Sequence, residues 1–146
     1  LDKVLARAEA QQKGGAFTPQ KIIFEFIVPN VTSSVHLSSN KVKFIIEFSM
    51  QDPDLQNRIK LYKATPIRKK RIVIAAYSNA NSTAIKNTKN ELFDLNFKSE
   101  GGNIYVFTPD KDLEPGEYIF FYSLMPGGVF GNALNGDIVS YSFTIE

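Results

Sequence analysis

The chain has no cysteine and no tryptophan, and it has a single histidine, His36. The lack of cysteine excludes disulfide bonds, thiolate metal sites and a cysteine nucleophile. One histidine cannot supply a common zinc site, and the surrounding VHLSS stretch contains no nucleophile elbow around Ser38 and Ser39. We therefore predict no catalytic residue, no metal site and no cofactor, and we interpret the protein as a non-enzyme.

Long apolar runs and a large net charge are also missing. No apolar run approaches the roughly 18 residues of a membrane-spanning helix, and no signal peptide is visible. The net charge of +2 is smaller than nucleic-acid binders usually carry, which argues against nucleic acid as a partner. The length of 146 residues predicts about one domain.

Residues that favour β-strands dominate the chain from residue 16 onward. The sequence has 12 Phe and 6 Tyr, with many Ile and Val residues, and short apolar segments recur with a period of two. In the VKFIIEFS segment, for example, Phe44, Ile46 and Phe48 alternate with polar residues that include Glu47. The expected strands cover residues 21–28, 42–49, 58–63, 71–78, 91–97, 103–108, 117–123 and 138–145, with a weaker one at 35–38. Frequent turn signals and the lack of intervening helices predict an all-β fold, an antiparallel immunoglobulin-like sandwich of about 7–9 strands over residues 16–146.

The first 15 residues show a different pattern. Leu1, Val4, Leu5 and Ala8 fall at helical spacing, and Gly14 and Gly15 follow them as a stop signal. This spacing predicts a short N-terminal helix over residues 1–15. Two interpretations remain open, namely the end of a longer helix and a frayed terminal or linker remnant.

The DLEPGEY stretch at residues 112–118 predicts a tight corner before the apolar run IFFYS. Pro115 fixes φ, Gly116 accepts a positive φ, and Leu113 supplies an inward anchor. Tyr118 would then turn its hydroxyl back to a backbone group a few residues upstream. This arrangement resembles the tyrosine corner of immunoglobulin-like and fibronectin-like domains. It indicates architecture, and it carries no information on activity.

A wider resemblance is clearest over residues 103–123, NIYVFTPDKDLEPGEYIFFYS. This stretch is similar to a domain that recurs in uncharacterised envelope-associated proteins of Bacteroidetes-type bacteria. The resemblance implies a location in the cell envelope or in the secreted fraction. It implies no activity, and a cytoplasmic location also remains open.

A basic segment between residues 58 and 71 is the first candidate binding feature. It holds seven basic residues and no acid, and we expect Arg58, Lys60 and Tyr62 to share the outer face of a strand. The candidate anion-binding residues are Arg58, Lys60, Arg68, Lys69, Lys70 and Arg71. They could bind phosphates, lipid headgroups or acidic polysaccharide, or they could instead protect an edge strand from pairing with other chains.

The second candidate is the long loop between the last two expected strands. It carries the apolar residues Met125, Val129, Phe130 and Leu134 among several glycines. Exposed apolar side chains on such a loop would indicate a protein partner. The alternative is that Phe130 and Leu134 fold back and cover the end of the domain.

Three functional hypotheses follow from these features. The preferred one is a non-enzymatic binding or structural module of a bacterial envelope or secreted protein, with a protein or an acidic polysaccharide as partner. The first rival is a binder of anionic polymers through the basic segment. The second rival is a glycan-processing or metal-dependent hydrolase, which a concave cleft lined by carboxylates would support.

Overall fold

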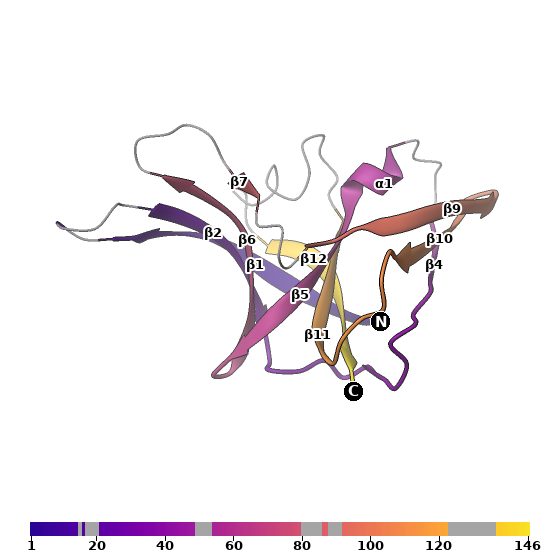
Figure 1. Cartoon of the computed structure of the whole chain (residues 1–146), viewed down its shortest axis with the longest axis horizontal. Coiled ribbons are helices and arrows are strands. Elements are labelled where there is room, and N and C mark those ends of the chain that lie inside the picture. Colours follow the sequence, from indigo (N-terminus) through magenta and orange to yellow (C-terminus); the bar gives the residue numbers. More distant parts are fainter. Residues whose placement is uncertain (15, 17–20, 49–53, 80–85, 88–91, 123–136) are drawn as a thin grey trace.

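The computed structural model describes residues 1–14, 16, 21–48, 54–79, 86–87, 92–122 and 137–146 (Figure 1). Within these residues it is all-β with mostly antiparallel strands, and α1 (Leu55–Arg58) is one short helix. The strands are β1 (Asp2–Lys13), β2 (Lys21–Pro29), β3 (His36–Leu37), β4 (Phe44–Glu47), β5 (Ile59–Ile67), β6 (Lys70–Asn79), β7 (Lys86–Asn87), β8 (Leu92–Phe93), β9 (Leu95–Gly101), β10 (Ile104–Pro109), β11 (Gly116–Tyr122) and β12 (Asp137–Ile145). No helix in this described part is long and apolar enough to cross a membrane.

The main sheet closes into a six-stranded barrel, which corrects the predicted immunoglobulin-like sandwich. The strands follow one another in the order β1, β2, β6, β5, β11 and β12, and β12 pairs with β1 to complete the circle (Figure 1). The pairing of β5 with β6 closes the barrel, with Thr65 opposite Ile72 and Ile67 opposite Lys70. A sandwich and a barrel both bury one face of each strand, so the alternating pattern of the sequence is the same in both.

The predicted N-terminal helix over residues 1–15 is wrong, because this segment contains strand β1. Residues 2–7 pair with β12, and residues 7–13 pair with β2. Ala6 is buried inside the barrel while its neighbour Leu5 is 55% exposed, which is the alternation of a strand. Pairing on both edges supplies backbone hydrogen bonds over the whole segment, and this tertiary gain outweighs the helical preference of its Ala, Leu and Gln residues.

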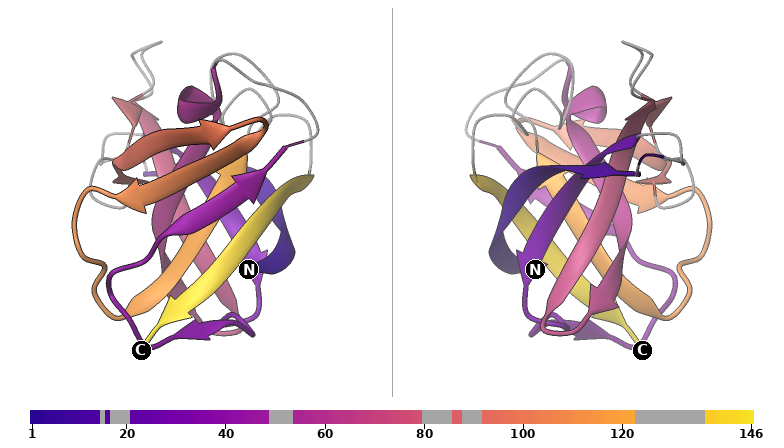
Figure 2. Two further views of the ribbon diagram at one scale, coloured as in Figure 1. Left: turned by 90° about the vertical axis from the view of Figure 1, so that its right-hand side faces the viewer. Right: turned by 90° about the vertical axis from the view of Figure 1, so that its left-hand side faces the viewer.

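A second sheet packs against one side of the barrel. It has three strands in the order β4, β10 and β9, and it lies over β5, β11 and β12 (Figure 2). The molecule therefore has two cores. The barrel core consists of Ala6, Phe26, Val28, Tyr62, Ala64, Val73, Ile119 and Phe121. The outer core, between the barrel and the second sheet, consists of Phe44, Leu55, Ile59, Leu61, Tyr105, Phe107, Leu113, Tyr118, Phe120, Phe143 and Ile145.

Strand β11 contributes to both cores, which explains why the run IFFYS is apolar on both faces. Ile119 and Phe121 belong to the barrel core, whereas Tyr118 and Phe120 belong to the outer core. All four side chains are buried. A strand that is covered on both faces needs an almost continuous apolar run rather than strict alternation.

The corner before β11 contains the hydrogen bond that the sequence predicts. The Tyr118 hydroxyl donates to the backbone carbonyl of Glu114 at 2.7 Å, and Leu113 is buried in the outer core. Gly116 has a φ of 151°, and a Cβ there would lie 2.9 Å from Cε of Lys63, so a side chain would meet both backbone strain and a close contact. The tyrosine corner is therefore a local structure that also forms in a barrel.

Candidate functional site

The six basic residues that the sequence groups together lie in separate parts of the molecule. Arg58 ends α1 and Lys60 lies at the start of β5, whereas Arg68, Lys69 and Lys70 lie at the hairpin between β5 and β6, which Figure 1 shows by their labels. An extended strand rises about 3.3 Å per residue, so roughly 25 Å separates the two groups. Tyr62 is not on an outer face with Arg58 and Lys60, because its side chain lies in the barrel core.

Of the six basic residues, Arg71 differs most from the prediction of a basic surface, because its side chain is fully buried. It points to the same side of β6 as Val73, which is a barrel-core residue. Its Nη1 donates to Oε2 of Glu117 at 3.0 Å, and its Nη2 donates to the Pro29 carbonyl at 3.4 Å. Arg71 is therefore not part of an exposed basic surface, since its charge is paired inside the protein.

Glu117 lies at the centre of a polar group at the end of the barrel where β11 begins, which we call the basal cluster. Oε1 accepts hydrogen bonds from the hydroxyls of Thr32 and Thr144, both at 2.8 Å. Oε2 accepts from the Ser33 backbone amide at 3.1 Å as well as from Arg71. The basal cluster consists of Thr32, Ser33, Arg71, Glu117, Ser142 and Thr144. Its hydrogen bonds tie the segment after β2 to the strands of the barrel.

The basal cluster contains the residue types of a hydrolytic site, but its geometry is structural. The Ser33 hydroxyl donates to the Ser142 carbonyl at 3.1 Å and accepts from the Ser142 hydroxyl at 3.2 Å. His36 lies at the surface, where its Nδ1 contacts Glu146 Oε1 at 3.0 Å. A nucleophilic serine needs a base within hydrogen-bond reach and access for substrate, whereas Ser33 is buried and bonded to another serine. Among the described residues, no group of three or more His, Asp or Glu side chains could hold a metal ion.

The predicted partner loop lies outside the described residues. Met125, Val129, Phe130 and Leu134 all fall within residues 123–136. The prediction of a protein contact by this loop therefore stays a prediction.

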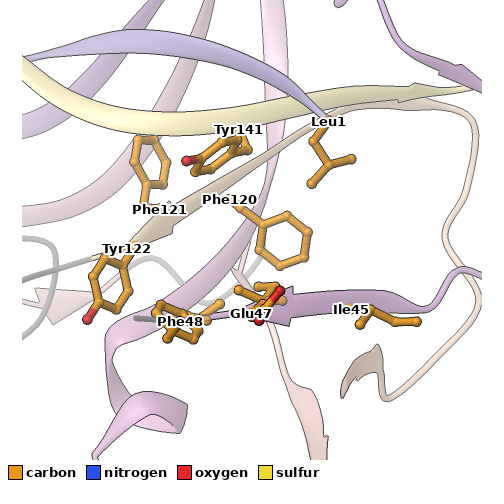
Figure 3. A pocket seen from close by; sticks show the side chains of 10 residues that line it. Leu1, Ile45, Glu47, Phe48, Phe120, Phe121, Tyr122 and Tyr141 are labelled. Carbon is orange, nitrogen blue, oxygen red and sulfur yellow. The ribbon is translucent and has the colours of Figure 1, made fainter. Parts of the chain in front are cut away.

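A cavity of about 540 Å³ opens between the free edge of β4 and the barrel, and none of its lining residues is among the sequence-predicted candidates (Figure 3). In Figure 3, Ile45, Glu47 and Phe48 lie on one side of the cavity, and Leu1 and Tyr141 lie on the other. The residues that line it are Leu1, Ile45, Ile46, Glu47, Phe48, Ile59, Phe120, Phe121, Tyr122 and Tyr141. Five of these ten residues are aromatic, and Glu47 has the one charged side chain among them.

Strand geometry explains how these side chains come together. Among the strands that the structure describes, only β10 pairs with β4, through Ile45 opposite Val106 and Glu47 opposite Ile104, which makes β4 an edge strand of the described sheet. Tyr141 lies on the same outward face of β12 as Phe143, but the outer core buries only Phe143. The second sheet thus covers only part of the barrel wall. Apolar side chains stay partly uncovered at its edge, where Ile45 is 69% and Tyr141 38% exposed.

Aromatic contacts fix the floor of the cavity. Phe48 packs against Tyr122 with a ring-centroid distance of 5.4 Å and against Tyr105 at 5.8 Å. Phe120 packs edge-on against Phe44 at 4.5 Å. Such contacts restrict the rings to one arrangement, so the apolar surface is formed before any ligand arrives.

Glu47 is the one charged side chain that lines the cavity among the described residues, and Leu1, which also lines it, carries the amino-terminal ammonium. The Glu47 side chain is exposed, and it forms no ion pair with any part of the chain that the structure describes. Elsewhere on the same sheet, Glu100 pairs with Lys98 at 3.1 Å. The residues that line the cavity are therefore mostly aromatic and aliphatic, with one acidic residue and the amino terminus among them.

No protein-family model matches the chain, and no match was found among curated proteins or among solved structures. The function must therefore be inferred from the arrangement of its residues.

Proposed function

We propose that the protein is a non-enzymatic binding module and that the cavity beside β4 is its ligand site. The observation that carries this proposal is the cavity itself, with a volume of about 540 Å³ and five aromatic lining residues. Ligand sites in proteins are typically concave, mostly apolar and preformed, with volumes of about 300–1,000 Å³ and a few polar groups. The cavity has each of these properties.

The placement of the chemically reactive side chains supports a binding role rather than a catalytic one. Glu117 and Ser33 are buried and bonded to each other, and they line no part of the cavity. Among the described residues that line the cavity, Glu47 has the one side-chain carboxylate, whereas glycoside hydrolysis requires a pair. A location in the cell envelope or the secreted fraction is part of this proposal and rests on the sequence resemblance alone.

Binding of neutral apolar probes tests this function. N-phenyl-1-naphthylamine fluoresces strongly only in apolar surroundings, and we expect saturable binding to one site on the protein. Tyr141→Ser should weaken this binding several-fold, because it removes an aromatic wall from the cavity. Val139→Ser is the matched control, since Val139 is 41% exposed on the same face of β12 and does not line the cavity. Unsaturable binding, or an equal loss in both variants, would refute the proposal.

A second candidate function is the binding of anionic polymers at the β5–β6 hairpin. Arg68 and Lys69 are exposed there and Lys70 is half-buried, so three cations lie within one turn. Salt-dependent retention on heparin would support this function if it is lost when these three residues are changed to Ser. If the variant and the native chain are retained equally, these charges do not bind the polymer. Their role would then be to prevent strand pairing with other chains.

A further inference from the structure

We propose that the cavity takes an extended peptide segment of a partner protein, which adds to the edge of β4 as a further strand of the second sheet. This inference rests on the proposed function, because it names the partner class of the same site. Three features lead to it, namely the backbone groups along the edge of β4, the contrast between the two edges of the second sheet, and the barrel wall beneath the cavity.

The backbone of β4 offers hydrogen bonds at the margin of the cavity. The Phe48 amide donates to the Asn103 carbonyl at 3.0 Å, which continues the antiparallel register of β4 and β10. Successive residues of an antiparallel strand turn their amide and carbonyl to opposite edges. Glu47 and Ile45 lie one and three residues before Phe48, so their amides and carbonyls point away from β10. Among the described residues, none forms a hydrogen bond to these edge-facing groups.

The backbone of these two residues, rather than their side chains, borders the cavity. Ile45 and Glu47 point to the exposed outer face of the second sheet, whereas Ile46 faces the barrel and packs against the outer core. An added strand would bond to the edge-facing backbone and point every second side chain into the cavity, toward Phe120 and Tyr141. The site therefore suits an extended chain with apolar side chains at alternate positions.

The two edges of the second sheet differ in their protection against strand pairing. β9 carries Lys98, and its register with β10 shifts between Ile104 and Tyr105. Lysine side chains and irregular pairing keep an edge strand from joining another chain. β4 contains no lysine or proline, its register with β10 is regular, and Ile45 is 69% exposed. The edge beside the cavity is therefore the one that can accept a further strand.

The barrel wall beneath the cavity favours a peptide over a second copy of this chain. In Figure 3, Tyr141 of the barrel strand β12 lies across the cavity from Ile45, so a strand added to β4 must lie over the barrel. In a second copy, β4 already covers its own barrel, where the rings of Phe44 and Phe120 are 4.5 Å apart. That copy would place its barrel against this one. A single extended segment has no layer beneath it and fits the cavity.

Binding of a short peptide to the native chain tests the inference. The probe is a fluorescein-labelled peptide, Lys-Thr-Phe-Thr-Phe-Thr-Lys, in which both phenylalanines project from one face of a strand. We expect saturable binding by fluorescence anisotropy, and we expect the unlabelled peptide to displace N-phenyl-1-naphthylamine. The control peptide, Lys-Thr-Thr-Phe-Phe-Thr-Lys, has the same composition but turns its phenylalanines to opposite faces, so it should bind several-fold more weakly.

Methylation of the peptide backbone separates strand addition from simple apolar binding. N-methylation of the three threonines removes N–H groups from one edge of the strand, and N-methylation of the two phenylalanines removes those of the other edge. We expect one set to lose affinity by about tenfold and the other to bind like the unmodified peptide. A loss in the threonine set indicates an antiparallel strand, and a loss in the phenylalanine set a parallel one. Equal effects in both sets would refute strand addition.

Two proline variants apply the same test to the protein. Ile45→Pro and Glu47→Pro remove unlike side chains but the same kind of edge-facing N–H, so each should weaken peptide binding by about tenfold. Ser99→Pro is the matched control on the other edge of the sheet. The Asp110 amide donates to the Asp94 carbonyl, so the same alternation turns the Ser99 N–H away from β10. This control should leave peptide affinity unchanged, and circular dichroism checks that all three variants are folded.

The outcomes separate the partner class from the proposed function. If N-phenyl-1-naphthylamine binds and the peptide does not, strand addition is refuted and the cavity remains a ligand site. An equal loss in Ser99→Pro and Glu47→Pro also refutes strand addition. A dimer in analytical ultracentrifugation that both β4 variants dissociate would refute the peptide partner, because the occupant would be a second copy. If the naphthylamine probe shows no saturable binding, the proposed function fails, and the partner class fails with it.

Discussion

The basal cluster and the cavity lie in different parts of the molecule. They differ in which side chains are buried and which are exposed. In the basal cluster, charged and hydroxyl groups are buried, and Glu117 alone accepts four hydrogen bonds. At the cavity, the apolar side chains of Ile45 and Tyr141 remain partly uncovered, and Glu47 forms no ion pair in the described part of the chain.

This difference separates residues that hold the fold together from residues that are available for binding. A buried polar group has a large free-energy cost unless it is paired, so the basal cluster should be sensitive to any change. An exposed side chain contributes little to stability, so the exposed residues that line the cavity, such as Ile45 and Tyr141, should tolerate change with little effect on unfolding. The following predictions test that contrast, from the largest expected effect to the smallest.

Glu117→Gln should destabilise the protein by about 3–5 kcal/mol, because it leaves the buried Arg71 guanidinium without a counter-charge. Urea unfolding followed by circular dichroism measures this loss. The matched control is Glu114→Gln, in which the lost partner is Lys63 at 3.1 Å in an exposed pair. The control should cost less than about 1 kcal/mol. Equal losses in the two variants would contradict the structural role of the basal cluster.

High pH should weaken the fold through Tyr118. Burial raises the pKa of this tyrosine to about 12 from its ordinary 10.0, with a further increase from the charge of Glu114, while the hydrogen bond to the Glu114 backbone acts in the opposite direction. The unfolded chain therefore releases this proton at a lower pH than the folded chain does. The contribution is complete below pH 10 and is lost as the pH rises to about 12, by roughly 2 kcal/mol.

The measurement for this pH effect is the free energy of unfolding at several pH values between 9 and 12, as a difference between the native chain and Tyr118→Phe. The difference cancels the titration of lysines, which both chains share. A constant difference across this range would contradict the raised pKa of Tyr118.

At neutral pH, Tyr118→Phe should cost about 1 kcal/mol. The substitution keeps the ring and its stacking on Phe143, with centroids 5.3 Å apart, and removes only the hydrogen bond to Glu114. Thermal unfolding should show a correspondingly small fall in Tm. A loss as large as that of Glu117→Gln would mean that the hydroxyl does more than close the corner.

Tyr141→Ser should change the free energy of unfolding by less than about 1 kcal/mol, although it weakens probe binding several-fold. Tyr141 lies at the surface, and its loss leaves both cores intact. Urea unfolding of the variant measures the first effect, and probe titration measures the second. A large destabilisation would show that Tyr141 belongs to the fold rather than to the ligand site.

Local features of this structure could be predicted from the sequence, because their causes are local. The corner at Leu113 to Tyr118 depends on a tight turn and a tyrosine, and its hydrogen bond is present. The alternation in β4 is also present, with Phe44 buried and Glu47 exposed. Most strands of the described residues follow the expected apolar segments. The exceptions are β1, the unexpected strand β7, and the expected strand over 91–97, which is divided between β8 of the main sheet and β9 of the second sheet.

Features that depend on which strands meet could not be predicted in this way. The residues of β1 favour a helix locally, and only their pairing with β2 and β12 makes them a strand. In the sequence, Arg71 is one of several neighbouring basic residues and looks like a surface cation. Its side chain is buried because the closed barrel brings β6 and β11 to the same interior. The cavity has the same origin, since Ile45 and Tyr141 are almost a hundred residues apart and meet only because the second sheet stops short of covering the barrel.

The shared strand β11 has a consequence for how this molecule unfolds. Its residues belong to the barrel core and to the outer core alike, so neither core can open without exposing the other. The two layers should therefore behave as one cooperative unit, with coincident transitions for probes placed in each. The backbone amides of β11 should exchange with solvent only through global unfolding, which makes them the slowest-exchanging group in the described part of the chain.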